Sequence, residues 1–324
     1  MVGMAATTTP ALVTLGETMA LFSSDRVGPL RHAATMRVGI AGAESNVAIG
    51  VRRLGHPAAW IGRVGSDELG HLVLGRLRAE RVDVDAAVVD QDAPTGLMVK
   101  EHRTADLTRV VYYRRDSAGS RLEPGDLDEA RIRAARVLHL TGITPALSAT
   151  ARAAVHAAAE TARGAGVPVS LDVNYRAALW SPERAGAELR DLARGCELVF
   201  AGEDEAELLV GDRGGPERAA AALAALGPRQ AILKLGAKGA LAVVDGELHR
   251  QPAVQVRAVD PVGAGDAFVA GYLAGVLDGR AGADCVRTGA ACGAFAVTVS
   301  GDWEGLPSRE ELDLLRHGDG TVLR

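Results

Sequence analysis

Short apolar runs alternate along the chain with longer stretches in which apolar side chains recur at helical spacing. The apolar runs have the length of β-strands and lie at residues 13–15, 58–61, 137–140, 169–172, 198–201 and 231–235. The stretches of helical period lie at residues 46–54, 68–80, 148–163, 182–194, 216–225, 264–277 and 285–299. This alternation predicts βαβ units, and therefore an α/β fold with a central, mostly parallel sheet that helices cover on both faces.

Two segments, 19–36 and 95–115, interrupt this alternation. In the second segment, the extended runs 96–102 and 108–114 flank a polar stretch at 103–106, which is the pattern of a β-hairpin. We expect the two segments to form a small β-lid over the main domain. Because such a lid exposes strand edges, we also expect it to pair subunits into a homo-oligomer.

Length and composition favour one large domain. Of the 324 residues, 48% are hydrophobic and 24% are charged, so the chain can bury a substantial core. No repeat, low-complexity tract or linker divides the sequence. We therefore expect a single domain over residues 11–324, preceded by a disordered N-terminus at residues 1–10.

Charge and hydropathy exclude several classes of partner. The net charge of −5 gives no reason to approach nucleic acid or an anionic membrane. The sequence has neither an apolar run of about 20 residues nor a secretory leader, so we expect a cytoplasmic protein without a membrane partner. The three cysteines form no C-x-x-C pair, which argues against a disulfide framework and a zinc site.

The most informative segment is DPVGAGDAF at residues 260–268, which leads directly into a helical pattern. The glycines of the turn Gly263, Ala264 and Gly265 let the backbone approach a ligand closely. The N–H groups of the helix start then point at that ligand with the positive end of the helix dipole. We therefore expect this turn to bind a phosphate group.

Asp266 follows the turn immediately. A carboxylate at a helix start more often caps the helix. Here, however, Asp266 can face a substrate hydroxyl while the amides of the turn face the transferred phosphoryl group, which is the pairing that phosphoryl transfer requires. The pattern therefore predicts Asp266 as the general base and the turn as the site that stabilises the transferred charge.

Two other phosphate-binding motifs are excluded by the same segment. The sequence contains no G-x-x-x-x-G-K-[ST], so it is not a P-loop enzyme. The turn also lacks the later glycine of the dinucleotide-binding fingerprint, which argues against a Rossmann dehydrogenase.

The DPVGAGDAF segment resembles the second signature of the ribokinase-like (PfkB) carbohydrate kinases, which ends in G-A-G-D. Residues 42–70, GAESNVAIGVRRLGHPAAWIGRVGSDELG, resemble the first signature, and the two occur in the expected order. The resemblance covers nearly the whole chain. It implies a ribokinase-like three-layer α/β/α sandwich with a small β-lid, and an enzyme that uses ATP and Mg²⁺ to phosphorylate a hydroxyl of a sugar.

Further segments resemble the 2-keto-3-deoxygluconate kinases within this family. They are GETMALF at 16–22, YYRRDSAGS at 112–120, HLTGITPALS at 139–148, LDVNYRAALWSPE at 171–183 and GDWEGLP at 301–307. This resemblance implies that the substrate is a keto-deoxy sugar acid, phosphorylated on its primary hydroxyl to the 6-phosphate. Two alternatives stay open, a kinase for a neutral ketose such as fructose and a non-catalytic sugar-acid sensor that retains the fold.

The resemblance also implies two sets of site residues. The sugar pocket would consist of Gly42, Ala43, Glu44, Ser45, Asn46, Tyr112, Arg114, Arg176, Asp266 and Asp302. The nucleotide would be surrounded by Asn174, Tyr175, Arg176, Gly202, Lys234, Leu235, Gly236, Ala237, Lys238, Gly239, Gly263, Ala264, Gly265 and Ala290. Physical chemistry supports the arginines in particular, because two guanidinium groups can bind a carboxylate or phosphates with a planar, bidentate geometry that lysine lacks.

Four positions depart from the family pattern. Gly202 replaces the Asn of an N-x-x-E element whose Glu is Glu205, so we expect no direct metal ligand there. Ala41 replaces the first glycine of the first signature, which is expected to stiffen the hinge of the lid. Met98 and Ala290 replace a Tyr of the lid and an adenine-side Asn, and the Met removes one hydroxyl contact to the sugar.

Overall fold

The structure, a computed structural model, describes residues 9–104 and 107–316. In this part of the chain, the main sheet has eight strands in the order β14-β13-β12-β11-β10-β9-β1-β4. The strands from β4 to β12 run parallel, and β13 and β14 are antiparallel. Their bounds are β1 (Leu12–Leu15), β4 (Ala58–Ile61), β9 (Val137–Thr141), β10 (Val169–Asp172), β11 (Leu198–Gly202), β12 (Gln230–Lys234), β13 (Ala240–Val244) and β14 (Glu247–Gln251).

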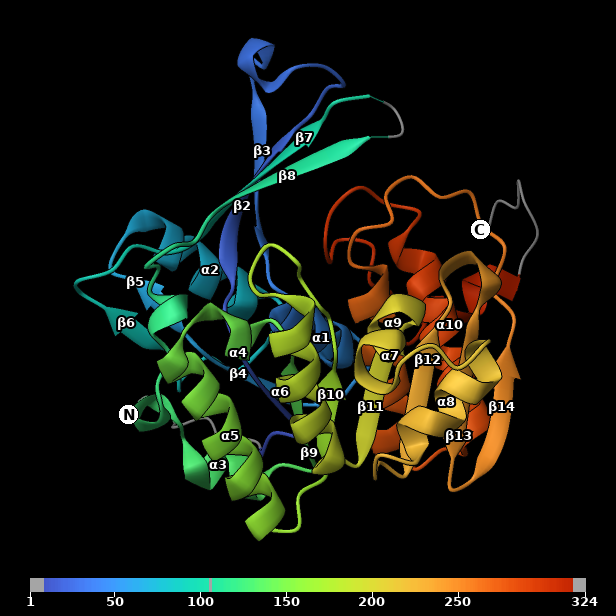
Figure 1. Cartoon of the computed structure of the whole chain (residues 1–324). Helices are drawn as coiled ribbons and strands as arrows, with labels where there is room; N and C mark the ends of the chain where they lie inside the picture. Colours follow the sequence, from blue (N-terminus) through green and yellow to red (C-terminus); the bar gives the residue numbers. More distant parts are fainter. Residues whose placement is uncertain (1–8, 105–106, 317–324) are drawn as a thin grey trace.

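Helices cover both faces of this sheet, as Figure 1 shows. Successive strand residues point to opposite faces, so Leu12 packs in one core and Val13 in the other. The first core includes α1 (Ala43–Arg53), α2 (Glu68–Ala79), α9 (Ala264–Leu277) and α10 (Gly282–Ala296). The second includes α3 (Glu129–Ala134), α4 (Thr144–Leu147), α5 (Ala149–Gly164), α6 (Pro182–Arg194), α7 (Glu203–Val210) and α8 (Pro216–Ala224). The predicted three-layer α/β/α architecture is confirmed.

The lid is a separate sheet with the strand order β3-β2-β7-β8, which stands apart from the main sheet in Figure 1. Its strands are β2 (Met19–Ser24), β3 (Met36–Ala41), β7 (Leu97–His102) and β8 (Thr108–Tyr113). The predicted segment 19–36 was too short, because β3 begins where that segment ends. The sequence of β3 shows no clear alternation, because Arg37 and Val38 are both exposed and the strand is fully buried only at Ile40 and Ala41.

The lid presents side chains to solvent that would suit contact with a second subunit. Val38, Tyr112 and Tyr113 are large exposed hydrophobic residues on its strands. Pairing of subunits through the lid nevertheless remains a prediction.

The hairpin of β13 and β14 was not predicted from the sequence. The hairpin turns at Asp245 and Gly246, which have φ angles of 50° and 86°. An Asp-Gly pair is a strong hairpin signal because both residues readily adopt positive φ angles, so this turn could have been predicted from the sequence.

The predicted disorder at residues 1–10 lies mostly outside the described residues. It is wrong for Pro10, which is buried just before β1.

Two smaller features complete the described fold. Strands β5 (Arg63–Gly65) and β6 (Val88–Asp90) pair in parallel as a separate two-stranded sheet. None of the helices in residues 9–104 and 107–316 is long and apolar enough to cross a membrane.

Candidate active site

A cleft of about 1630 Å³ lies between the lid and the main sheet. Its walls come from the lid strands β2, β7 and β8, from the residues at the carboxyl ends of β10, β11 and β12, and from the start of α9. Ligands of open α/β sheets bind at this edge, where the carboxyl ends of parallel strands meet. The sheet and lid together therefore define the position of a binding site.

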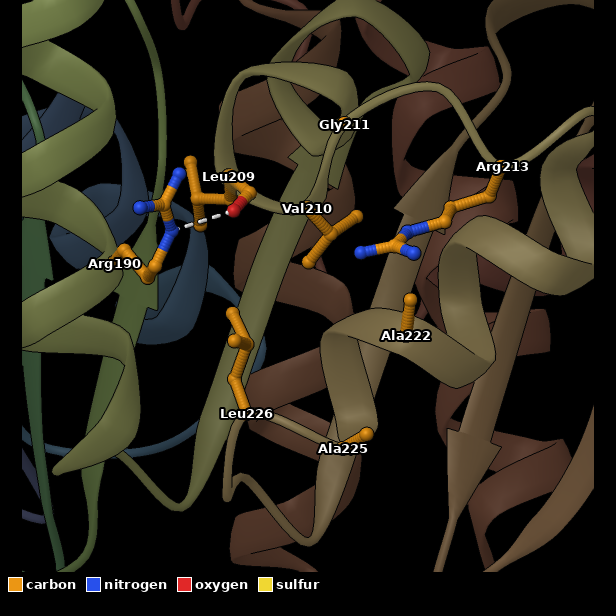
Figure 2. A pocket seen from close by; sticks show the side chains of 8 residues that line it. All are labelled: Arg190, Leu209, Val210, Gly211, Arg213, Ala222, Ala225 and Leu226. Carbon is orange, nitrogen blue, oxygen red and sulfur yellow. Dashed lines mark hydrogen bonds between the residues drawn. The ribbon is translucent and has the colours of Figure 1, made fainter.

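A second pocket, of about 640 Å³, lies among α6, α7 and α8 (Figure 2). Arg190 and Arg213 line it together with apolar side chains, and Arg190 Nε donates a hydrogen bond of 2.7 Å to the carbonyl oxygen of Leu209. None of the site residues predicted from the sequence lines this pocket. It is a hollow between helix surfaces, and its lining residues include no carboxylate, histidine, cysteine or hydroxyl group that could act as a base or nucleophile.

The glycine-rich turn forms the floor of the cleft at the start of α9. Gly263 has a φ angle of 77°, and a Cβ atom at this position would overlap the carbonyl oxygen of Asp302. No side chain caps the N-terminus of α9. The N–H of Ala264 donates a long hydrogen bond of 3.4 Å to the carbonyl oxygen of Pro261, and the N–H groups of Gly265 and Asp266 that follow are available to a ligand. The turn thus presents bare backbone amides and the positive end of a helix dipole, as an anion site requires.

Asp266 lies in the first turn of α9 and lines the cleft. The side-chain amide of Asn46, on α1, donates a hydrogen bond of 2.8 Å from Nδ2 to Oδ2 of Asp266. Burial raises the pKa of Asp266 to about 6, although the Asn46 hydrogen bond and the charges of Lys234 and Arg176 oppose this rise. At neutral pH the group is therefore mostly a carboxylate that can accept a proton.

Lys234, the last residue of β12, bonds to another carboxylate instead of pointing freely into the nucleotide region. Its ammonium group donates hydrogen bonds of 2.6 and 2.8 Å to Oδ1 and Oδ2 of Asp172. Burial alone would lower the pKa of Lys234, but Asp172 and Glu205 outweigh it and raise the pKa. A Cβ atom on Gly265 would lie 3.5 Å from the same nitrogen, so this permanent positive charge lies beside the turn.

The two arginines expected at the substrate differ in their surroundings. Arg114 follows β8, and Glu17, 1% exposed, accepts its Nε hydrogen bond at 2.8 Å. Ser117 donates to the other oxygen of Glu17 at 2.5 Å. Arg176 lines the same cleft and is exposed, and no described side chain forms an ion pair or hydrogen bond with it. Of these two arginines, Arg176 is therefore the one that can bind a new anion without displacing a protein partner.

Most of the residues predicted from the sequence lie together in this one cleft. They are Gly42, Ala43, Glu44, Asn46, Tyr112, Arg114, Asn174, Tyr175, Arg176, Gly202, Lys234, Leu235, Gly236, Gly263, Gly265, Asp266 and Asp302. Met98 of the lid also lines the cleft, with its side chain largely buried. The functional roles assigned to these residues remain predictions.

Other predicted residues do not line the cleft: Ser45, Ala237, Lys238, Gly239, Ala264 and Ala290. Ser45 is buried and donates a hydrogen bond to the carbonyl oxygen of Gly42, whereas Ala290 packs in the core between α9 and α10. Lys238 is exposed and pairs with Glu203 at 3.1 Å. Gly239 adopts a φ angle of 103° in a turn against the residues that follow β14.

Three charged residues had not been identified from the sequence: Glu17 and Lys100, which line the cleft, and Asp260, which contacts Lys100 behind it. Lys100 Nζ lies 2.6 Å from Oδ2 of Asp260, and both side chains are buried. Burial raises the pKa of the neighbouring Asp302 to about 7, although the charge of Lys100 opposes this rise. Lys100 could have been singled out from the sequence because lysine is rare in this chain, which contains only three.

The donor set of the cleft suits hydrated Mg²⁺ bound mainly by phosphates. No group of three or more His, Cys, Asp or Glu side chains in the described residues could enclose a metal ion. The two oxygens of Glu205 accept hydrogen bonds from the backbone N–H groups of Tyr175 and Gly202, at 2.9 and 2.7 Å, while the carboxylate lines the cleft. Because Mg²⁺ keeps several waters and needs only one or two carboxylates beside substrate phosphates, Glu205 fits such an ion.

Comparison with known proteins agrees with this arrangement. The family model for the pfkB family of carbohydrate kinases matches residues 9–309. The 2-dehydro-3-deoxygluconokinase of Bacillus subtilis is 40% identical over 314 residues, covering 96% of this chain and 96% of that protein. The enzyme of the same name from Thermoproteus tenax is 40% identical, covering 94% of each chain.

Solved structures of relatives share the fold. A PfkB protein from Polaromonas sp. JS666 is 38% identical with a TM-score of 0.85, covering 94% of this chain and 99% of that one. A putative ribokinase II from E. coli, solved in complex with ATP and Mg²⁺, is 26% identical with a TM-score of 0.88, covering 95% and 100%. The chain belongs to the pfkB family of carbohydrate kinases.

Proposed function

We propose that this protein is a 2-keto-3-deoxygluconate kinase, also called 2-dehydro-3-deoxygluconokinase. It would transfer the γ-phosphoryl group of ATP to the primary hydroxyl of the sugar acid and release ADP and the 6-phosphate. The observation that carries this proposal is a free guanidinium group, that of Arg176, in the same cleft as the carboxylate of Asp266. The names of the two relatives at 40% identity support the same substrate.

Asp266 would act as the general base. Asn46 occupies one carboxylate oxygen and fixes the orientation of the group, which leaves Oδ1 for the sugar hydroxyl. As the bond between this hydroxyl oxygen and the γ-phosphorus forms and the bond from phosphorus to the ADP oxygen breaks, the proton moves to Asp266 and later to solvent.

The glycine-rich turn would stabilise the charge of the transferred group. Its backbone amides and the dipole of α9 are already in place, so little reorganisation is needed during transfer. The ammonium group of Lys234 adds a positive charge beside Gly265. Mg²⁺, when bound with the phosphates, would neutralise part of their charge, and Glu205 is the residue that would orient its waters.

The pH dependence of the reaction should follow the ionisation of Asp266. Because its pKa is raised to about 6 and only the carboxylate can accept a proton, kcat/KM should fall as the pH drops below about 6. Asn46→Ala removes a hydrogen bond that favours the charged form of Asp266. The pKa of Asp266 should rise, and the fall of kcat/KM at acidic pH should begin at a higher pH. Profiles of kcat/KM for the sugar acid against pH, recorded for the wild type and for Asn46→Ala, would measure the fall and its shift. The same profile in both proteins would mean that another group, such as ATP itself, titrates in this range.

Arg176→Ala should selectively impair acidic substrates. Loss of a charge-assisted hydrogen bond of roughly 1.5–3 kcal/mol should lower kcat/KM for 2-keto-3-deoxygluconate by about 10- to 100-fold, with a smaller effect on fructose. The measurement is a coupled assay of ADP formation over a panel of keto-deoxy sugar acids and ketoses. Arg184→Ala, which removes an exposed charge on α6 outside the cleft, is the matched control and should leave the panel unchanged.

The panel also separates the alternatives. An equal loss for acidic and neutral sugars in Arg176→Ala would mean that the arginine binds phosphates alone. A wild-type preference for fructose would replace the proposal with a neutral-ketose kinase. Absence of sugar-dependent ATP consumption with every sugar would favour a sensor without catalytic activity.

A further inference from the structure

A buried lysine connects the lid to the phosphate-binding turn. Lys100 lies on β7, in the middle of the lid hairpin, and its side chain is only 1% exposed. Its ammonium group donates a hydrogen bond of 2.6 Å to Oδ2 of Asp260 and lies 3.6 Å from Oδ1 of Asp302. The contact with Asp260 joins residues that are 160 positions apart in the chain.

Both carboxylates belong to segments that shape the turn. Oδ1 of Asp260 accepts a hydrogen bond of 3.1 Å from the N–H of Val262, and Oδ2 accepts one of 3.4 Å from the N–H of Gly301. The carbonyl oxygen of Asp302 in turn lies so close to Gly263 that no side chain fits there. One ammonium group therefore holds together a lid strand, the start of the turn at residues 260–263 and the loop at residues 301–302.

Among the described residues, Lys100 is the single positive charge that pairs with the two carboxylates of Asp260 and Asp302. Oδ1 of Asp302 is buried and accepts no hydrogen bond from any described residue. A buried carboxylate that loses its countercharge is strongly destabilised, because the remaining charge is neither solvated nor paired. Displacement of β7 would therefore disturb Asp260 first, and through Asp260 the backbone amides that follow it.

We propose that Lys100 is a positioning residue that couples the lid to the geometry of the phosphate-binding turn. Its ammonium group fixes Asp260, Asp260 fixes the turn, and the turn presents its amides to the transferred phosphoryl group. The kinetic part of this inference rests on the proposed kinase function, whereas the structural coupling does not.

Lys100→Met tests the kinetic part, because methionine keeps most of the volume and removes the charge. We expect kcat to fall by about 10²-fold, since a misplacement of about 1 Å at a reacting centre has an effect of this size. KM for ATP should change much less, because most of the residues predicted to surround the nucleotide do not contact Lys100 or Asp260. Arg133→Met, which removes an exposed charge on α3, is the control and should retain wild-type kcat.

Chemical rescue distinguishes positioning from a general loss of structure. Lys100→Ala opens a space beside two carboxylates, so added ammonium chloride should restore kcat at least several-fold. Ammonium should have no effect on Lys100→Met, in which the side chain fills the space, or on the wild type. Tetramethylammonium chloride, whose cation is too large for the space, controls for ionic strength. A kcat for Lys100→Ala within twofold of wild type, or a loss that ammonium does not restore, would refute the positioning role.

Two further measurements keep the inference testable if a single variant folds poorly or the substrate proposal fails. Lys100→Met/Asp260→Asn removes the charge left unpaired at Asp260, and its kcat should be no lower than that of Lys100→Met, because both changes break one contact. Additive losses would overturn the inference. Hydrogen exchange of the amides at residues 262–266 needs no sugar, and it should be faster in Lys100→Met than in the wild type. Unchanged exchange would refute the coupling, even if the sugar acid proved not to be the substrate.

Discussion

Replacing Asp266 with asparagine is expected to lower kcat by about 10²–10⁴-fold, the range typical for loss of a general base. Asparagine has nearly the same shape and can still contact Asn46 from α1, so the start of α9 should keep its position. It cannot, however, take the proton of the sugar hydroxyl. Because the amides of the turn belong to the backbone, they remain in place, and binding of ATP should change little.

The measurement is steady-state kcat for the sugar acid combined with calorimetric binding of ATP. A matched control is Asp278→Asn, at the opposite end of α9, where the carboxylate pairs with Arg309 and lies outside the cleft. That variant should retain kcat even if its stability falls. If Asp266→Asn turned over at a near-normal rate, another group would have to act as the base.

The parts of the fold that the sequence predicted are those with local signals. Strands β4 and β10 and helices α6 and α9 have the predicted bounds, and α6 begins with Ser181 as its cap and Pro182 in its first turn. Strand β14 was missed although Asp245-Gly246 marks the turn before it, because it is an edge strand with mostly exposed polar residues, ELHRQ, and its pairing with β13 determines its conformation. Its sequence lacks the alternation that marks a half-buried strand.

The residues of the site, too, were predicted where a local motif marks them and missed where they depend on contacts between distant segments. Asp266 and the turn before it were predicted because one short segment contains both the glycines and the acid. By contrast, the contacts Lys100–Asp260 and Arg114–Glu17 join residues 160 and 97 positions apart. Such contacts depend on how the lid folds onto the main sheet, and no local pattern reports them. Ala290 does not line the cleft for a related reason, since only the packing of α10 on α9 determines which face of α10 is buried. Its contact with adenine stays a prediction.

Gly263→Ala is expected to lower kcat by about 10²–10³-fold, the cost of losing a donor that stabilises developing charge. A Cβ atom at this position would overlap the carbonyl oxygen of Asp302, so the turn has to move. The backbone φ angle of 77° adds strain of roughly 1–2 kcal/mol for any residue with a side chain.

Gly279→Ala separates strain from the effect on the site. Gly279 follows α9 with a φ angle of 74°, and a Cβ atom there would have nothing within 4 Å. Both variants should lose stability through backbone strain, and Gly263→Ala should lose more because its Cβ also overlaps Asp302, which thermal unfolding would measure. Only Gly263→Ala should lose kcat. Equal kcat values in the two variants would mean that the amides of the turn do not contact the transferred phosphoryl group. A fall in kcat confined to Gly263→Ala would instead tie catalysis to the position of those amides, because the strain is common to both.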